Sequence, residues 1–382
     1  MIPLSVPNLK GNEEKYVLNA IRNEWISTAG SYVNEFENDL KKYLNIDNVA
    51  ACQSGTAAIH LALRLSGVTA NSEVIVPTLT FIAAVNPVKY LGAEPIFMDC
   101  DDGLNMDCNK LEEFLKNECI FTNDGLMNKS TNRNIKALVI VHIFGNMANV
   151  EKIKELTDKY NIKLIEDATE ALGTYYTNGK YNGKFAGTIG DFGAYSFNGN
   201  KIITTGGGGV LVGHSSEDIK RAKYLSTQAK DDELYYVHDY IGYNYRMTNL
   251  QAALGVAQLE KIEEFIKIKV KNYELYKSNI NNINGLKLLE YNNKARNNYW
   301  FYSLLINDYK LDRDNLLKYL LENNIQTRPI WKLIHTQKPY RNNQAYKIEK
   351  AINYYNKILN IPCSTNLKQE SIEYIIDTLK KV

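Results

Sequence analysis

The chain has 382 residues, of which 45% are hydrophobic and 23% charged, and its formal net charge is +2. These proportions are typical of a globular protein with room for one large and one smaller domain. The near balance of 45 basic and 43 acidic residues gives no indication of nucleic acid or an anionic membrane surface as a partner.

The five cysteines are odd in number and form no CxxC pair. We therefore expect reduced thiols and no metal site, rather than a disulfide or zinc framework. The first residues, MIPLSVPNLKGNEEK, lack the basic stretch and apolar core of a signal peptide, and no apolar run is long enough to cross a bilayer. These observations predict a cytoplasmic protein that does not enter a membrane.

The predicted elements begin with two helices, at residues 12–25 and 33–44. Short apolar strands then alternate with helices: strands are predicted at 49–52, 73–76, 95–98, 137–144 and 163–165, and helices at 56–65, 82–91, 111–115 and 150–160. A polar insert at 122–134 is predicted to be a surface loop. Such alternation indicates an α/β fold with a mainly parallel sheet covered on both faces, where ligands bind at the carboxyl ends of the strands.

One lysine, Lys201, lies between the aromatic run at 192–197 and the four glycines at 206–209, which precede an apolar run at 210–212. This pattern predicts a strand, a tight turn and a second strand, with a bulky group close to the glycine backbone. A partly desolvated lysine there would have a lowered pKa and an amine available for a Schiff base. The alternative is an ordinary surface hairpin lysine.

Two nucleotide-binding motifs fail at the same stretch. The P-loop pattern fails because Asn200 separates Gly199 from Lys201 and neither Ser nor Thr follows the lysine. The dinucleotide fingerprint needs a helix after the glycines, whereas residues 210–212 are typical of a strand.

Two other predicted strands end in polar side chains. Ser54, Gly55 and Thr56 follow the strand at 49–52 and begin a helix, which suits a phosphate, although a plain N-cap is the alternative. Glu166 and Asp167 follow the strand at 163–165 and should point to opposite faces, so at most one of them faces a site. Asp167 could pair with a buried cation or a protonated ring nitrogen, and a cap for the next segment is the alternative.

A phosphate cradle, a carboxylate and a reactive lysine at three strand ends are together the parts that hold pyridoxal phosphate. The chain resembles the DegT/DnrJ/EryC1/StrS family of sugar aminotransferases, within the type I aminotransferase fold. The resemblance is carried, in order, by WISTAGSYVNEFE, QSGTAAIHLAL, PTLTFIAAVNPV, IEDATEALG, GTIGDFGAYSFNGNKIITTGGGG and YIGYNYRMTNLQAALGVAQLEKI.

The resemblance implies roles for individual residues. Lys201 matches the lysine that forms the Schiff base with the cofactor, and Asp167 the partner of its pyridinium nitrogen. The other matched positions are the phosphate-binding Ser54, Gly55, Thr56 and Ser196, the ring-stacking Phe81, the sugar-proximal Ser27 and Thr28, and Asn244, which would reach the cofactor phosphate of a neighbouring subunit. The last assignment implies a homodimer with shared active sites.

Glu170 stands where many members of this family carry a glutamine beside the phenolic oxygen of the cofactor. A carboxylate there must be protonated or repel that oxygen. Dehydratase members replace the lysine with histidine, so Lys201 favours transamination, with L-glutamate as the implied amino donor and ping-pong kinetics.

Residues 1–250 are expected to form the large domain and 251–382 a smaller α+β domain. A capping box at Thr248 and Gln251 predicts a long helix over residues 249–270 that joins the two. The aromatic run at 299–302 is interpreted chiefly as core packing.

Near the C-terminus, TRPIWKLIH contains Arg328, Trp331, Lys332 and His335, which suit a nucleotide diphosphate; a solvated edge with a buried tryptophan is the alternative. With the SFNGNKIITT stretch, this segment resembles the subgroup that aminates C4 of UDP-linked 4-keto-6-deoxy-N-acetylhexosamines in bacillosamine and legionaminic acid pathways, whose products serve surface glycan, lipopolysaccharide or glycoprotein synthesis. GDP-perosamine synthases and dTDP-sugar C3 aminotransferases are the near alternatives. A sugar dehydratase and a non-catalytic cofactor-binding regulator are the alternatives from other classes.

Overall fold

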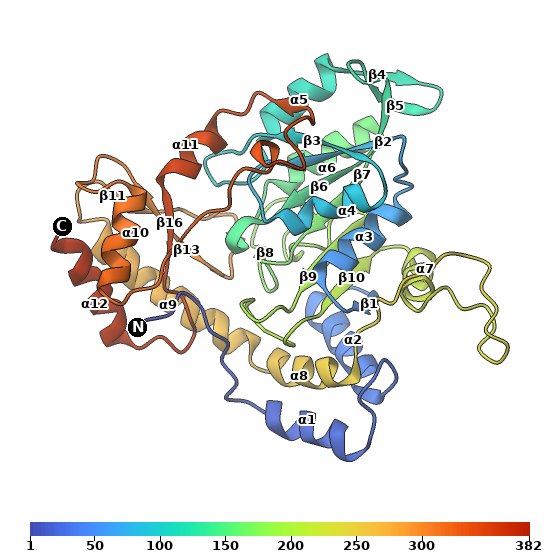
Figure 1. The fold of residues 1–382 in the computed structure, drawn as a ribbon, viewed down its shortest axis with the longest axis horizontal. Helices are drawn as coiled ribbons and strands as arrows, with labels where there is room; N and C mark the ends of the chain where they lie inside the picture. Colours follow the sequence, from blue (N-terminus) through green and yellow to red (C-terminus); the bar gives the residue numbers. More distant parts are fainter.

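A ten-stranded sheet forms the centre of the larger part of the protein in a computed structural model that describes residues 1–382 (Figure 1). Its main path runs β1-β10-β9-β7-β6-β2-β3-β15. The bounds are β1 (Asn48–Cys52), β2 (Ser72–Pro77), β3 (Glu94–Met98), β6 (Arg133–Val141), β7 (Lys163–Asp167), β9 (Phe192–Ser196), β10 (Gly209–Gly213) and β15 (Ala345–Tyr346).

On this path β10 is antiparallel to both of its neighbours, whereas the pairs from β9 through β15 are parallel. The carboxyl ends of β1, β7 and β9 therefore lie at one edge of the sheet, and the chain returns into β10 from that same edge. This arrangement confirms the α/β class with a mainly parallel sheet, and it places the predicted polar strand ends together.

Helices cover both faces of the sheet. One layer contains α3 (Gly55–Leu65), α4 (Asn86–Tyr90) and α7 (Ser216–Ser226), and the other α2 (Ser31–Leu44), α5 (Cys108–Asn117) and α6 (Val150–Tyr160). Alternation along β1 shows why the sheet needs two layers: Val49 and Ala51 join one buried cluster, and Ala50 and Cys52 the other.

The smaller part has its own core around an antiparallel sheet in the order β11-β13-β16-β14. Its elements are α9 (Ile262–Ile280), β11 (Leu286–Leu288), β13 (Tyr302–Ile306), α10 (Arg313–Glu322), β14 (Arg328–Pro329), α11 (Lys350–Lys357), β16 (Ile358–Ile361) and α12 (Gln369–Lys380). A two-stranded ribbon of β8 (Tyr175–Tyr176) and β12 (Ala295–Arg296) links it to the larger part.

The packing does not follow a single boundary at residue 250. The helix α8 (Asn249–Leu259) packs on α1 (Glu13–Arg22) and α2, and β15 pairs with β3 in the large sheet. At the other end of the chain, Ile2 pairs with Ile325, so both termini lie beside the small domain (Figure 1).

Several predicted elements differ from the structure. The long helix expected over residues 249–270 is two helices, α8 and α9, although its capping box at Thr248 and Gln251 is confirmed. The helix expected over 82–91 is a 3-10 turn (Ile82–Ala84) followed by α4, and the tight turn after β9 is a loop over residues 197–208. The insert at 122–134 is a hairpin of β4 (Cys119–Thr122) and β5 (Gly125–Asn128), with β5 paired to β6.

None of the helices combines the length and hydropathy that crossing a membrane requires.

Candidate active site

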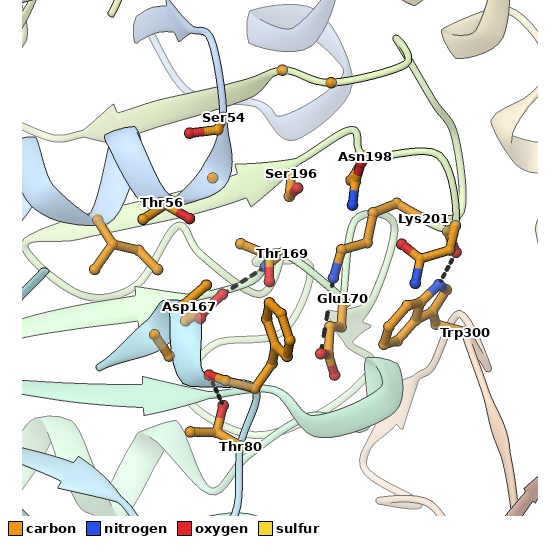
Figure 2. A pocket seen from close by; sticks show the side chains of 18 of the residues that line it. Ser54, Thr56, Thr80, Asp167, Thr169, Glu170, Ser196, Asn198, Lys201 and Trp300 are labelled. Carbon is orange, nitrogen blue, oxygen red and sulfur yellow. Dashed lines mark hydrogen bonds and ion pairs between the residues drawn. The ribbon is translucent and has the colours of Figure 1, made fainter. Parts of the chain in front are cut away.

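A cavity of about 360 Å³ opens where the carboxyl ends of β7 and β9 meet the first turn of α3 (Figure 2). Its volume is within the range of small-molecule sites. Its walls come from Ser54, Gly55, Thr56, Ile59, Thr80, Phe81, Ala83, Ala84, Asp167, Thr169, Glu170, Ser196, Asn198, Asn200, Lys201, Gly207, Gly208, Trp300, Phe301 and Trp331.

Lys201 extends from the loop at 197–208 into the middle of this cavity (Figure 2). Its Nζ lies 3.9 Å from Oε1 of Glu170 and 4.2 Å from the ring centroid of Trp300. Burial lowers the pKa of the Lys201 amine, and the two carboxylates of Glu170 and Asp167 only partly oppose this effect. The amine is therefore more readily deprotonated than that of a surface lysine, as the sequence predicted.

Glu170 is buried beside the lysine, and its Oε2 accepts a hydrogen bond of 2.7 Å from the backbone N–H of Phe144. Burial raises the pKa of Glu170 to about 7, even though Lys201 and the Phe144 N–H both favour the ionised form. The carboxyl group can thus gain or lose a proton near neutral pH.

Asp167 ends β7 with only 3% of its surface exposed. Its Oδ1 accepts a hydrogen bond of 3.0 Å from the N–H of Thr169, it makes no ion pair, and burial raises its pKa. Glu166 points to the other face of the sheet, where it accepts from Gly190 N–H and lies 3.0 Å from Nε2 of His142. Asp167 is therefore the carboxylate that faces the cavity, and it has room for a protonated nitrogen.

The first turn of α3 forms the end of the cavity opposite Lys201 and Glu170. Ser54 is an N-cap, with Oγ accepting from Ala57 N–H at 3.1 Å, but the other N–H groups of a first turn lack helical partners and the helix dipole favours an anion. A Cβ on Gly55 would lie 2.8 Å from Cβ of Ser196, and one on Gly209 would lie 2.4 Å from the Ser54 carbonyl carbon. The glycines thus let β9 and β10 approach this turn closely.

An anion cradle, a buried carboxylate without a cation and a desolvated amine fit the phosphate, the ring nitrogen and the aldehyde of pyridoxal phosphate, respectively. The family model described as the DegT/DnrJ/EryC1/StrS aminotransferase family matches residues 7–380. The chain belongs to this family.

A GDP-perosamine synthase from Escherichia coli O157:H7 is 36% identical over 382 residues, covering 100% of this chain and 98% of the relative. A UDP-4-amino-4,6-dideoxy-N-acetyl-beta-L-altrosamine transaminase from Campylobacter jejuni is 29% identical, covering 99% and 96%. The solved aminotransferase TlmJ from Streptoalloteichus hindustanus superposes with a TM-score of 0.89 at 24% identity, covering 100% and 98%, which shows the shared fold. The protein is a pyridoxal phosphate-dependent sugar aminotransferase.

In a DegT-family aminotransferase the bound cofactor supplies an electron sink. Ser54, Gly55, Thr56 and Ser196 would hold its phosphate, Asp167 would keep its ring nitrogen protonated, and Phe81 would cover its ring. Lys201 would carry protons at its Nζ, with Glu170 as the nearest carboxyl group.

The predicted basic cluster is not brought together around this cavity. Trp331 is part of its wall, and Arg328 instead lines an adjoining cavity of about 360 Å³ that shares Trp331. Lys332 is exposed and lines neither cavity, and the Nδ1 of His335 bonds to Oγ1 of Thr78 at 2.5 Å. The spacing suggested one patch because TRPIWKLIH is short, but the backbone turns its side chains in different directions.

Three further predicted residues lie outside the cavity of their own chain. Asn244 is exposed, and Ser27 and Thr28 are in an exposed loop whose Ser27 carbonyl accepts from the N–H of Asn249. None of the three therefore contributes to the wall of this cavity.

The sequence interpretation gave no site role to nine residues of the cavity wall: Ile59, Thr80, Ala83, Ala84, Thr169, Asn198, Asn200, Trp300 and Phe301. The polar ones lie within two positions of predicted site residues in the sequence, which is a usable signal. Trp300 and Phe301 were interpreted as core, and no sequence signal separated them from the buried aromatics around them.

Proposed function

We propose that this aminotransferase transfers an amino group from L-glutamate to C4 of a nucleotide-linked 4-keto-6-deoxy sugar. The observation that carries the proposal is the meeting of the Lys201 amine, the buried Asp167 carboxylate and the α3 anion cradle in one cavity, on the scaffold of a sugar aminotransferase family. Amino transfer needs one group that removes and returns protons at close range, and the desolvated Lys201 amine is suited to both.

The adjoining cavity supports a nucleotide-linked substrate. It contains Arg328, whose guanidinium makes no ion pair, together with the amides of Gln326 and Asn360, and no acidic side chain lines it. A cation and neutral amides suit a diphosphate. Trp331 lies between the two cavities, so a substrate could place its sugar in the first and its phosphates in the second.

Two nucleotide carriers have specific support. A GDP-linked keto sugar is the first candidate, because two GDP-perosamine synthases, from E. coli and Vibrio cholerae, are 36% and 33% identical to this chain. A UDP-linked N-acetyl sugar is the second, because of the sequence motifs and the 29% identical C. jejuni transaminase.

We also propose that two copies share each active site. The segment after α7 projects from the larger part (Figure 1) and exposes Leu234, Tyr235, Tyr236 and Ile241, with Ile241 87% exposed. Such a patch on an arm suits an interface with a second copy. Asn244 follows this arm and lies outside its own cavity.

The test is a half-reaction followed by the absorbance of the bound cofactor. L-glutamate should convert the cofactor to its amino form, and one sugar from a panel of GDP-, UDP- and dTDP-linked 4-keto-6-deoxy sugars should restore the first spectrum. Lys201→Ala should show neither change. If L-glutamate leaves the spectrum unchanged, the donor assignment is wrong; if no keto sugar restores it, the acceptor assignment is wrong.

A further inference from the structure

Trp300 contacts both the amine of Lys201 and the backbone of the residue before it. The residue lies just before β13 and only 2% of its surface is exposed. Its ring centroid is 4.2 Å from Nζ of Lys201, and its indole N–H donates a hydrogen bond of 2.6 Å to the carbonyl of Asn200. One side chain thus meets the charged head of the lysine and the backbone that precedes it (Figure 2).

The backbone of Trp300 is itself held from behind. Its carbonyl accepts a hydrogen bond of 2.8 Å from Nζ of Lys269, and its N–H donates to Oδ1 of Asn298 at 3.0 Å. Lys269 is a buried residue of α9 that also donates to the carbonyl of Cys363. The backbone of Trp300 is therefore held both by Lys269 of the small domain and by the Phe144 carbonyl of the large one, while the indole ring faces Lys201.

The ammonium group of Lys201 lies between two partners of different kinds. Nζ of Lys201 lies 3.9 Å from the Glu170 carboxyl group and 4.2 Å from the ring centroid of Trp300. A tryptophan ring is the strongest aromatic partner for a cation, and the attraction increases where water is excluded. Here the lysine side chain is 11% exposed, so little water competes.

We propose that Trp300 is a positioning residue, which holds the free protonated amine of Lys201 beside Glu170 and fixes the loop that carries it. The ring keeps the flexible lysine side chain within the cavity whenever the amine is not joined to the cofactor. The indole N–H removes freedom from the backbone at Asn200. Together these contacts keep the proton-carrying atom in one place during the reaction.

The first test examines the contact itself in cofactor-free protein and does not depend on the reaction. The chain has three tryptophans, so Trp25→Phe with Trp331→Phe leaves Trp300 as the only indole. In this background, Lys201→Met should shift the emission of Trp300, because a charge leaves the face of the ring. The matched control keeps Trp331 alone, through Trp25→Phe with Trp300→Phe; Lys201→Met should shift its emission far less.

The second test examines proton transfer, and it rests on L-glutamate being the donor. Trp300→Phe removes the indole N–H and weakens the attraction to the cation. We expect the half-reaction rate to fall about 10- to 100-fold at saturating donor, with little change in the donor concentration needed. The deuterium isotope effect from glutamate labelled at its α-carbon should rise, because proton transfer becomes the slow step.

Trp25→Phe is the matched variant for this second test, since Trp25 is 58% exposed and lines neither cavity. It should leave the isotope effect at the wild-type value. Trp300→Leu removes the ring face as well, so its half-reaction rate should fall further than that of Trp300→Phe. Thermal unfolding of each variant identifies one that fails to fold. An unshifted Trp300 emission overturns the contact. An unchanged rate and isotope effect in folded Trp300→Phe overturn the positioning role, whereas failure of wild type with glutamate concerns the proposed donor alone.

Discussion

Glu170 differs in charge from the glutamine that many family members carry at this position, and its surroundings show how the protein accommodates it. The carboxyl group is buried, accepts one backbone hydrogen bond from Phe144 and faces the Lys201 amine. With its pKa raised to about 7 by burial, it is protonated below neutral pH and then resembles a carboxamide, since both groups donate a hydrogen bond. Above neutral pH it becomes a carboxylate, which only accepts.

Replacing Glu170 with Gln should therefore change the pH dependence of the reaction more than its rate at low pH. The wild-type donor half-reaction should show an inflection near pH 7 that Glu170→Gln lacks, and the two rates should agree within about tenfold at pH 6. Single-turnover absorbance between pH 5.5 and about 9 measures both. Glu14→Gln, on the exposed side of α1, is the control; an inflection that survives in Glu170→Gln would assign it to another group.

His60 is a second residue whose burial has a measurable consequence. It lies on α3 with 5% of its surface exposed; its Nδ1 is 3.0 Å from the Tyr245 hydroxyl, and its Nε2 has no partner. Burial, helped by nearby Arg64, lowers the pKa of His60 to about 4. Between about pH 6.5 and pH 4, His60 binds a proton in the unfolded chain but stays neutral in the folded chain. The free energy of unfolding therefore falls as the pH falls from 6.5 towards 4.

The expected loss of stability from His60 is about 2 kcal/mol between pH 8 and pH 5. Urea unfolding of the cofactor-free protein at the two pH values measures it. The variant His60→Asn should lack that part of the loss, whereas His214→Asn, at an exposed position, should retain it. Equal losses in wild type and His60→Asn would contradict the prediction.

At the scale of elements, the site depends on how closely α3 approaches β9 and β10. A Cβ on Gly55 would meet Cβ of Ser196 at 2.8 Å and Cγ2 of Thr169 at 2.9 Å, and neither atom is the end of a flexible chain. Gly55→Ala should therefore push the first turn of α3 away from β9. The same movement would open the anion cradle.

We expect Gly55→Ala to lower the free energy of unfolding by about 1–3 kcal/mol and to weaken cofactor binding by about tenfold. Denaturant unfolding and titration of cofactor-free protein with pyridoxal phosphate measure the two effects. Gly199→Ala is the matched control: it lies two residues from Lys201, and an added Cβ there would meet nothing within 4 Å. An unchanged affinity of Gly55→Ala for pyridoxal phosphate would contradict the prediction.

The regular alternation of strands and helices made the large sheet predictable, because buried parallel strands are continuous apolar runs. The break between α8 and α9 was not predictable, because the sequence on both sides of it favours a helix and the interruption depends on residues far away in the chain. Glu260, at that break, accepts hydrogen bonds from the Tyr16 hydroxyl and the Asn12 amide, about 250 positions earlier in the chain. The β4–β5 hairpin was missed for a similar reason: its strands are only four residues long, and β5 is stabilised by pairing with β6.

At the scale of the whole molecule, the proposed dimer makes a quantitative prediction. If Asn244 serves the neighbouring active site, a chain with Lys201→Ala and a chain with Asn244→Ala should each be inactive or weak alone. In a mixed dimer, one site receives both intact residues. Mixing equal amounts after dissociation and reassociation should restore about a quarter of wild-type activity, because half of the dimers are mixed and one of their two sites is complete.

Activity of the mixture equal to the mean of the two separate variants would show that Asn244 acts in its own chain or not at all. Two chains that each carry Lys201→Ala provide the zero level. Sedimentation of the wild-type protein and of Ile241→Ser tests whether the exposed arm joins the copies, since a polar residue on that arm should favour the monomer.

The residues of the site that sequence reasoning found are those at strand ends, where fold rules bring them together. Trp300 escaped because its role depends on Lys269 and Asn200 rather than on any local pattern. The hydrogen bond of His335 to Thr78 joins positions 257 residues apart, which no spacing reveals.

The cavity draws its walls from positions 54 to 331, and this span has a consequence for the order in which the protein is made. The ribosome synthesises the chain from its N-terminus, and early segments can fold while later ones are still being made. The phosphate cradle, Asp167 and Lys201 all emerge well before the two tryptophans of the cavity. A nascent chain that ends before Trp300 therefore already carries the reactive amine but has no indole against which to hold it.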